Sequence, residues 1–245
     1  MENVNGYMET YIIIIEKEEP VPENIRTWAK QHLVAVVPER NCGEAALLDA
    51  YDYVIEYSKD VSLKYLEIAY CHTHNLPAII AETESLIIKE IGMEETEEYR
   101  KIIENVPNAV SDKTLLGLSS EEFARRHRAY MMYSYGLLGY GIYGVYLKNP
   151  VKGTTCATGN DGCEKMIGIA GLDGTEVPLL SYAVLKEYQG MGYAFSACCS
   201  IMDYFFTETE MDKVNISVAK DNGPSINLAR KLADRYAGKI MLTLV

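Results

Sequence analysis

The sequence lacks long apolar runs. None approaches the roughly 20 residues that a helix needs to cross a bilayer. Its opening residues, MENVNGYMET, also lack the basic start and the apolar stretch of a secretory signal. We therefore expect a cytoplasmic protein that does not enter membranes. A repeat of fixed period and a low-complexity tract are missing as well, which argues against solenoids and arrays.

Cysteine and positive charge are also scarce. The six cysteines show no CxxC spacing, so neither a disulfide framework nor a zinc knuckle is indicated. His72 and His74 stand beside Cys71, but no second group of ligands accompanies them, and we expect no metal site. The formal net charge of -12 argues against a nucleic-acid backbone as partner.

What is present suits a soluble globular protein. With 48% hydrophobic and 24% charged residues, the 245-residue chain can bury a sizeable core and is long enough for two units. The short apolar runs TYIIIIEK and LVAVVPER are typical of buried parallel strands, and ENIRTWAKQH between them has helical spacing. With a further helix over VSLKYLEIAYCHTHN, these patterns predict a small β-α-β module over residues 1–82.

A second pattern covers residues 83–245. A strand in ESLIIKEI is followed by a helix in EETEEYRKIIENV and by another helix that Ser119 and Glu122 start as a capping box. YGIYGVYLKN and KMIGIAGLDG predict an antiparallel hairpin with an exposed loop, and VPLLSYAVL predicts another strand. The expected order is strand, helix, helix, hairpin, strand, helix, strand, helix, strand.

Two glycines, Gly190 and Gly192, separate the strand that ends near Leu185 from the next helix. The first N–H groups of a helix lack intrahelical partners and carry partial positive charge, so an anion fits there without a basic side chain. Glycines allow close approach and positive φ, which lets N–H groups converge on a diphosphate. The segment therefore predicts phosphate binding, although glycine spacing alone equally allows a strand-to-helix turn with tight packing.

The familiar phosphate motifs do not fit this turn. Phe195 stands where G-x-G-x-x-G needs its third glycine, and nothing after Gly192 supplies the Gly-Lys-Ser/Thr of a P-loop. The stretch QGMGYA instead resembles the signature Q/R-x-x-G-x-G/A of GNAT superfamily acyltransferases. VNISVAKDNGPSINLARKL is similar to a second family block, N-x-x-S-x-x-L, at Asn222, Ser225 and Leu228.

The resemblance implies an α/β (α+β) fold: a mixed central sheet of the acyl-CoA N-acyltransferase type with helices on both faces, preceded by the small β-α-β module. Residues 1–82 resemble a module found ahead of this domain in some bacterial proteins. In the family, two parallel strands part and the pantetheine arm of acetyl-CoA lies between them, bonded to backbone. The positions implied to bind it are Ala183, Val184, Gln189, Gly190, Met191, Gly192, Tyr193, Ala194, Asn222 and Ser225. For Asn222, helix capping is an alternative that can coexist with binding.

Acyl transfer from a thioester to an amine needs a neutral nitrogen, a polarised carbonyl and a proton for the leaving thiolate. Family members often carry a glutamate and a tyrosine at the positions that align with Leu179 and Ala229, and both are missing here. Glu176 and Tyr182 share strand parity: they are an even number of residues apart, so their side chains lie on the same face of a regular strand. Glu176 is therefore a substitute base if the strand is regular back to residue 176. Tyr182 is a candidate proton donor or a wall of the cofactor site.

We therefore expect an N-acetyltransferase that moves an acetyl group from acetyl-CoA directly to an amine of a small molecule or peptide. One alternative is a CoA-binding sensor or interaction protein without turnover, and another is a nucleotide-binding α/β protein of a different family. A homodimer is compatible with the sequence. The acceptor stays unnamed because variable loops, such as residues 104–120, would bind it.

Overall fold

The computed structural model describes residues 12–15, 33–36, 53–54, 62–106, 113–148 and 164–245. The chain divides into two compact units, residues 1–78 and 79–245. The predicted helix over residues 23–32 and the loop over residues 150–163 lie outside the described residues.

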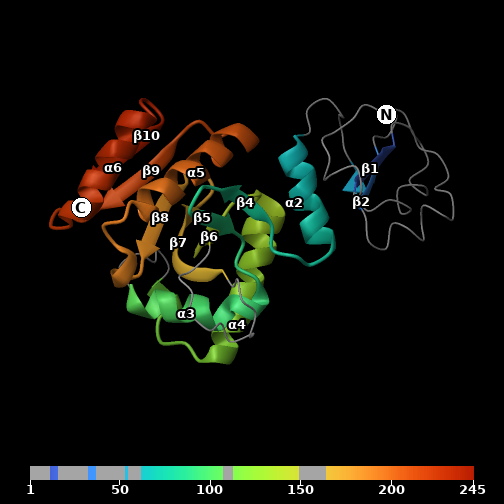
Figure 1. Ribbon diagram of the computed structural model, residues 1–245, viewed down its shortest axis with the longest axis horizontal. Helices are drawn as coiled ribbons and strands as arrows, with labels where there is room; N and C mark the ends of the chain where they lie inside the picture. The colour runs from blue at the N-terminus through green and yellow to red at the C-terminus, as the bar shows by residue number, and fades with distance from the viewer. Residues whose placement is uncertain (1–11, 16–32, 37–52, 55–61, 107–112, 149–163) are drawn as a thin grey trace. The chain divides into compact units, whose positions relative to one another are not determined.

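The first unit contains a parallel sheet of three short strands, of which Figure 1 labels β1 and β2. β1 (Ile12–Ile15), β2 (Leu33–Val36) and β3 (Tyr53–Val54) follow one another in that order across the sheet. The two parallel strands predicted from their apolar runs are thus confirmed.

One helix of this unit is described, α2 (Leu63–Thr73). It starts at Ser62, whose side-chain oxygen accepts a hydrogen bond from the N–H of Tyr65 at 3.0 Å. It ends before Asn75, which has a φ of 55°. Asparagine tolerates this left-handed conformation better than most residues do, which explains why the helix stops where the sequence predicted.

The second unit is built on a seven-stranded mixed sheet. Neighbouring strands from β4 to β8 are antiparallel, whereas β8, β9 and β10 are parallel. The sheet order is β10-β9-β8-β7-β6-β5-β4, with β4 (Ile79–Glu82), β5 (Leu86–Lys89), β6 (Ile142–Leu147), β7 (Lys165–Asp173), β8 (Leu179–Val184), β9 (Val214–Val218) and β10 (Ile240–Leu244). The expected mixed sheet is confirmed. β4, which the sequence analysis assigned to the first module, pairs with β5 in this sheet.

Helices cover both faces of the sheet, as predicted. α3 (Thr96–Asn105) and α4 (Ser120–Tyr130) lie on one side, and α5 (Tyr193–Glu208) and α6 (Gly223–Arg235) on the other (Figure 1). α4 starts at the predicted cap, where the Ser119 hydroxyl accepts a hydrogen bond from the N–H of Glu122 at 3.3 Å. The helix continues as a π-helix, η6 (Met131–Leu138), which the spacing of apolar residues did not indicate.

Side chains of β8 alternate between the two faces of the sheet. Ala183 belongs to the core under α3 and α4, together with Phe123 and Ile169. By alternation, Leu179 and Ser181 face the same side, and Tyr182 faces the side of α5 and α6. The α5 side is a separate apolar layer that includes the fully buried Ile201, Met202 and Phe205. Both faces of β8 therefore serve the candidate site described next.

Candidate functional site

β8 and β9 are joined at one end and separate toward the other. Their register consists of the single pair Leu179 and Asn215. Asn215 closes this end, because its N–H donates to the Pro178 carbonyl at 2.8 Å and its Nδ2 donates to the Val177 carbonyl at 3.1 Å. Both strands are fully described, and beyond Leu179 no further pair joins them, whereas β8 stays paired with β7 as far as Val184. We call this gap in the ladder the open ladder.

The peptide groups of β8 alternate between β7 and the open ladder. The N–H of Leu185 donates to the Ile167 carbonyl at 2.9 Å, so odd-numbered residues of β8 turn their peptide groups toward β7. Even-numbered residues turn theirs the other way, and the Val184 carbonyl accepts a hydrogen bond from Gln189 Nε2 at 2.9 Å. The backbone of Tyr182 thus faces the open ladder. The backbone of Ala183 faces β7, so the expected backbone contact from Ala183 to a pantetheine arm does not fit this geometry.

The turn after β8 contains the two glycines. Gly190 has a φ of 77° and Gly192 a φ of 84°, both in the left-handed region. A Cβ built on either glycine would meet nothing within 4 Å. The positive φ, rather than tight packing, therefore requires glycine at both positions. The packing alternative that the sequence left open is wrong.

The N-terminus of α5 follows this turn directly. Gly192 is its N-cap, and no side chain in the described part of the chain caps the helix. The N–H of Ser196 bonds to the Gly192 carbonyl at 3.0 Å, whereas the N–H groups before it have no acceptor within the helix. Met191, at the tip of the turn, is 59% exposed. This arrangement suits an anion that approaches from solvent.

α6 also starts at the open end of the ladder, since it follows the C-terminal end of β9. The Asn222 side chain accepts a hydrogen bond from the N–H of Ser225 at 3.2 Å, which confirms the capping alternative for Asn222. The Ser225 carbonyl accepts a hydrogen bond from the Tyr182 hydroxyl at 3.3 Å. The structure thus brings together Tyr182 and Ser225 across the open ladder, with the glycine turn at its end.

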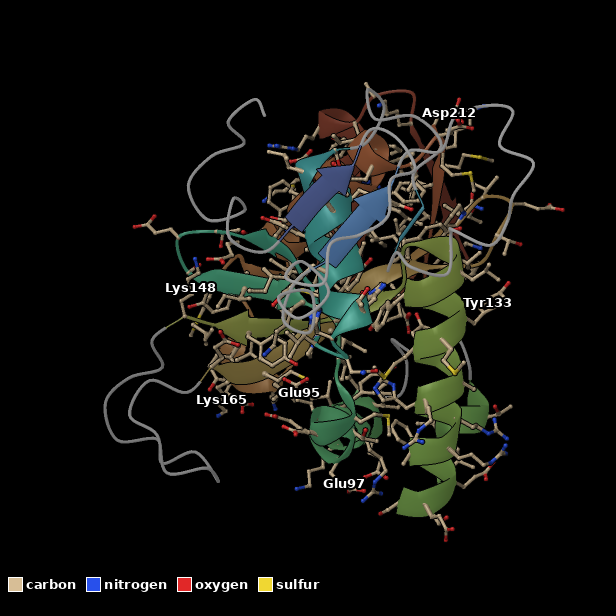
Figure 2. All side chains as sticks on the ribbon, turned by 90° about the vertical axis from the view of Figure 1, so that its right-hand side faces the viewer. Glu95, Glu97, Tyr133, Lys148, Lys165 and Asp212 are labelled. Carbon is tan, nitrogen blue, oxygen red and sulfur yellow. The ribbon has the colours of Figure 1, made fainter. Side chains whose placement is uncertain are left out.

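The Lys165 side chain contacts the segment just before the glycine turn. The Lys165 ammonium donates to the Tyr188 hydroxyl at 2.9 Å, one residue before Gln189, and this bond raises the pKa of Lys165. Figure 2 shows Lys165 at the opposite side of the molecule from Asp212, which precedes β9. Burial raises the pKa of Tyr182. It also raises the pKa of Cys198, so that this buried thiol on α5 is not a nucleophile.

The condition for Glu176 as a base, a strand that is regular from residue 176 to Tyr182, is not met. It is exposed in the bend between β7 and β8, and Gly174, with a φ of 96°, ends the regular backbone before it. β8 starts only at Leu179. The strand is therefore not regular back to residue 176, and the parity argument that made Glu176 a base fails.

Sequence reasoning missed Asp173. This last residue of β7 is the register partner of Leu179, at the closed end of the open ladder. It is half-buried, and its Oδ1 accepts a hydrogen bond from the N–H of Gly174 at 3.0 Å. Burial is the main cause that raises the pKa values of Tyr130 and Tyr140, and the negative charge of Asp173 raises them further. Its position beside Leu179 follows only from the pairing of β7 with β8.

Residues 119–233 match the family model described as an acetyltransferase (GNAT) domain. The chain carries a GNAT acetyltransferase domain. The match extends from the cap of α4 into α6 and includes the glycine turn. The predicted fold class and the acyltransferase class are thus confirmed, and the alternative of an unrelated nucleotide-binding protein is dropped. A search of curated proteins found no match.

Several solved structures are similar to the chain. A protein of the GnaT acetyltransferase family from Bordetella pertussis is 21% identical over 62% of this chain and 86% of its own, with a TM-score of 0.46. A ribosomal L7/L12 alpha-N-protein acetyltransferase in complex with coenzyme A is 16% identical over 62% and 81%, with a TM-score of 0.49. The Salmonella typhimurium acetyltransferase that modifies the N-terminal serine of L7/L12 is 15% identical over 62% and 82%, with a TM-score of 0.47.

Two further observations concern ligands and membranes. In the described ranges, the structure holds no group of three or more histidine, cysteine, aspartate or glutamate side chains that could bind a metal ion. None of the described helices is both long enough and apolar enough to cross a bilayer.

Proposed function

We propose that this protein is an N-acetyltransferase that uses acetyl-CoA and transfers the acetyl group directly to an amine of a small molecule or peptide. The observation that carries the proposal is the open ladder. β8 and β9 part beyond Leu179 and Asn215, and the uncapped N-terminus of α5 lies at the wide end. A nucleotide with a long thiol-bearing arm needs both features, an anion site and a slot of polar backbone leading away from it.

The chain has suitable groups for each part of acetyl-CoA. The diphosphate would be held by backbone N–H groups of the turn and of the first turn of α5, where the two left-handed glycines shape the backbone. The pantetheine arm would bond to the peptide groups of Tyr182 and Val184, which face the open ladder. The proposed binding residues on the turn and on α6 are Gln189, Gly190, Met191, Gly192, Tyr193, Ala194, Asn222 and Ser225.

Tyr182 is better suited to a wall of this slot than to an acid. Its hydroxyl donates to the Ser225 carbonyl, and burial raises its pKa. An ordinary thiol has a pKa near 8.5 and an ordinary tyrosine near 10, so proton donation from a tyrosine with a raised pKa to the departing thiolate is uphill. We infer that the thiolate takes its proton from solvent and that Tyr182 holds α6 against β8.

The rival function, a CoA-binding protein without turnover, has one observation in its favour. Ala229, the position where a tyrosine is expected from the resemblance, is fully buried on α6 and offers no polar group. Leu179 likewise carries no base. Such a protein would bind acetyl-CoA and release no thiol.

Two measurements test the proposed function. Acetyl-CoA at about 100 times its dissociation constant should stabilise the protein by roughly 2.7 kcal/mol in thermal unfolding. NAD and ATP at the same concentration should stabilise it much less, and an equal response to all three would contradict the proposal. Free thiol is then followed while small amines and peptides with a free N-terminus are offered. Release with any of them supports transfer, and binding without release supports the rival.

A homodimer remains a proposal of its own, and so does the division into two domains, which the structure places after residue 78 rather than residue 82 because β4 belongs to the larger sheet. The oligomeric state is tested by light scattering on the full chain. The division is tested by limited proteolysis, which should cut between the modules before it cuts within the larger sheet.

A further inference from the structure

We propose that Asp173 is the carboxylate that accepts the proton of the acceptor amine during acetyl transfer. The inference rests on the proposed function, because it takes the position of the thioester from the way acetyl-CoA would lie in the open ladder. Nothing in the sequence pattern distinguishes Asp173 from the other exposed or half-exposed acidic residues.

The length of β8 locates the reacting group. Residues 180 to 184 advance about 3.3 Å each, so they cover about 16 Å from the turn toward the closed end of the ladder. An extended pantetheine arm has a similar length. With its diphosphate at the N-terminus of α5, the arm therefore brings the thioester close to Leu179 and Asn215, where β8 and β9 meet.

Asp173 lies at this closed end. It is directly opposite Leu179 in the β7–β8 ladder, on the same face of the sheet. Opposite residues have Cβ atoms about 4.5–5.5 Å apart, and diagonal neighbours such as Ser181 about 7–8 Å. The three β8 side chains on this face are Leu179, Ser181 and Ala183, and the hydroxyl of Ser181 is the polar group among them. A carboxylate on β7 can therefore reach the same space directly or through the Ser181 hydroxyl.

The carboxylate is positioned by its surroundings. Its Oδ1 accepts from the Gly174 N–H at 3.0 Å, and the Gly174 carbonyl accepts from the Tyr140 hydroxyl at 2.8 Å. On the neighbouring strand, the N–H of Ile142 donates to the Tyr130 hydroxyl at 2.7 Å. These bonds tie the residue after β7 to Tyr140, in the segment before β6, and the start of β6, the strand next to β7, to Tyr130 of α4. A proton acceptor held on rigid elements suits catalysis better than one on a mobile loop.

Two exposed carboxylates near this end of the sheet, Glu176 and Asp212, are less suitable. Glu176 is exposed in the bend between β7 and β8. Asp212, labelled at the upper right of Figure 2, is exposed in the segment before β9. Asp173 differs from both because it belongs to a strand and is half-buried on the sheet face.

The neutral amine nitrogen attacks the thioester carbonyl carbon, so that a C–N bond forms and the C–S bond breaks. One proton passes from the nitrogen to the Asp173 carboxylate. The sulfur leaves as a thiolate and takes a proton from solvent, and Asp173 returns its proton to solvent. Nothing is oxidised or reduced, and the products are an amide and free CoA.

The test compares Asp173→Asn with Asp212→Asn, a matched change of an exposed carboxylate near the same end of the sheet. We expect kcat to fall by about 10²- to 10⁴-fold in Asp173→Asn, the usual contribution of a general base. The dissociation constant of acetyl-CoA, measured by calorimetry without acceptor, should change by less than about threefold in both variants, because no binding group is lost. Asp212→Asn should keep the wild-type kcat.

A relocated carboxylate separates a chemical role from a structural one. The double variant Asp173→Asn with Leu179→Glu places the carboxylate on the opposite residue of the same pair. Its kcat should be at least about tenfold higher than that of Asp173→Asn, since side chains at both positions reach the same space. Leu179→Gln in the Asp173→Asn background has a side chain of matched size without charge and should recover nothing.

The outcomes are distinct. Unchanged kcat in Asp173→Asn overturns the inference, as does a loss in Glu176→Gln with none in Asp173→Asn. Wild-type protein that binds acetyl-CoA but releases no thiol with any amine contradicts the proposed transfer itself, as in the test of the rival, rather than the choice of carboxylate. Failure of the wild type to bind acetyl-CoA contradicts the proposed function itself.

Discussion

The Tyr182 side chain links strand β8 to helix α6. Its hydroxyl reaches from β8 to the Ser225 carbonyl on α6, and its backbone faces the open ladder. One side chain thus spans the site at the level where the thioester arm would lie. This position accounts for a tyrosine here without giving it a proton to transfer.

Replacement of Tyr182 by phenylalanine should therefore weaken the site without stopping the chemistry. We expect a loss of about 1 kcal/mol in the free energy of unfolding, typical of one hydrogen bond, and a rise of a few-fold in the dissociation constant of acetyl-CoA. The turnover rate should stay within about threefold of wild type, measured by thiol release at saturating substrates. If turnover instead falls by about two orders of magnitude or more, Tyr182 is restored as a proton donor.

His127 is buried without a full set of partners. It is 3% exposed in the core between α3 and α4, where its Nε2 lies 2.9 Å from the Ile91 carbonyl. Among the residues that the structure describes, its Nδ1 has no hydrogen-bond partner, and its ring lies 5.2 Å from that of Tyr99. Burial lowers the pKa of His127, opposed by hydrogen bonds to backbone carbonyls and by the charge of Glu95. The imidazole is therefore neutral in the folded protein near pH 7.

This histidine should make the protein less stable in mild acid. Because its folded pKa lies below the ordinary value of about 6.5, the unfolded chain binds more protons below that pH, and stability falls as pH decreases from about 6.5 toward the folded pKa. His127→Gln keeps a donor for the Ile91 carbonyl and removes the titration. Urea unfolding between pH 5 and 8 should show a shallower acid loss in this variant. Parallel curves for the two proteins would contradict the account.

The turn between β8 and α5 acts through its backbone shape. Gly190 and Gly192 both hold left-handed φ values with open space around them. An alanine would fit sterically at either position but would favour another backbone conformation. The direction of the N–H groups at the start of α5 depends on this conformation.

We expect Gly192→Ala to cost about 1–2 kcal/mol of stability and to weaken acetyl-CoA binding about tenfold. Gly238→Ala is the matched control, because Gly238 has a φ of 81° and equally open surroundings in the turn before β10. It should lose similar stability and keep wild-type affinity in calorimetry. Equal loss of affinity in both variants would show that general destabilisation, rather than the shape of the turn, is responsible.

The start of α6 combines a cap with a place near the proposed diphosphate. Asn222→Ala removes the bond to the Ser225 N–H and should cost about 1 kcal/mol of stability. Asn222→Asp keeps a capping oxygen, so its stability should stay near wild type, but its negative charge should weaken acetyl-CoA binding several-fold. Wild-type affinity in Asn222→Asp would place the diphosphate away from α6.

Much of the fold follows from local patterns in the chain. The order of strands and helices in the larger unit, the cap at Ser119 and the end of α2 near Asn75 depend on residues close together in sequence. The assignment of β4 depends on which sheet a four-residue apolar strand joins, and nothing within the strand specifies its partner. The π-helix depends on hydrogen-bond register, which side-chain spacing does not reveal.

The same division applies to the candidate site. The glycine turn is readable because two glycines and a helix start lie within a few residues, and positive φ is a local requirement. The opening between β8 and β9, the start of β8 only at Leu179 and the place of Asp173 all depend on strand pairing between distant segments. The sequence therefore predicts where a phosphate would bind but not which carboxylate lies beside the reacting group.

Hydrogen exchange with and without acetyl-CoA tests the central claim most directly. Saturating acetyl-CoA should slow exchange in peptides that cover residues 180–184 and 189–195, because the backbone N–H groups of the open ladder and of the turn would bond to the ligand. Peptides from α3 should change little. If acetyl-CoA binds and leaves the exchange of both site segments unchanged, the account of the open ladder as the acetyl-CoA site is contradicted.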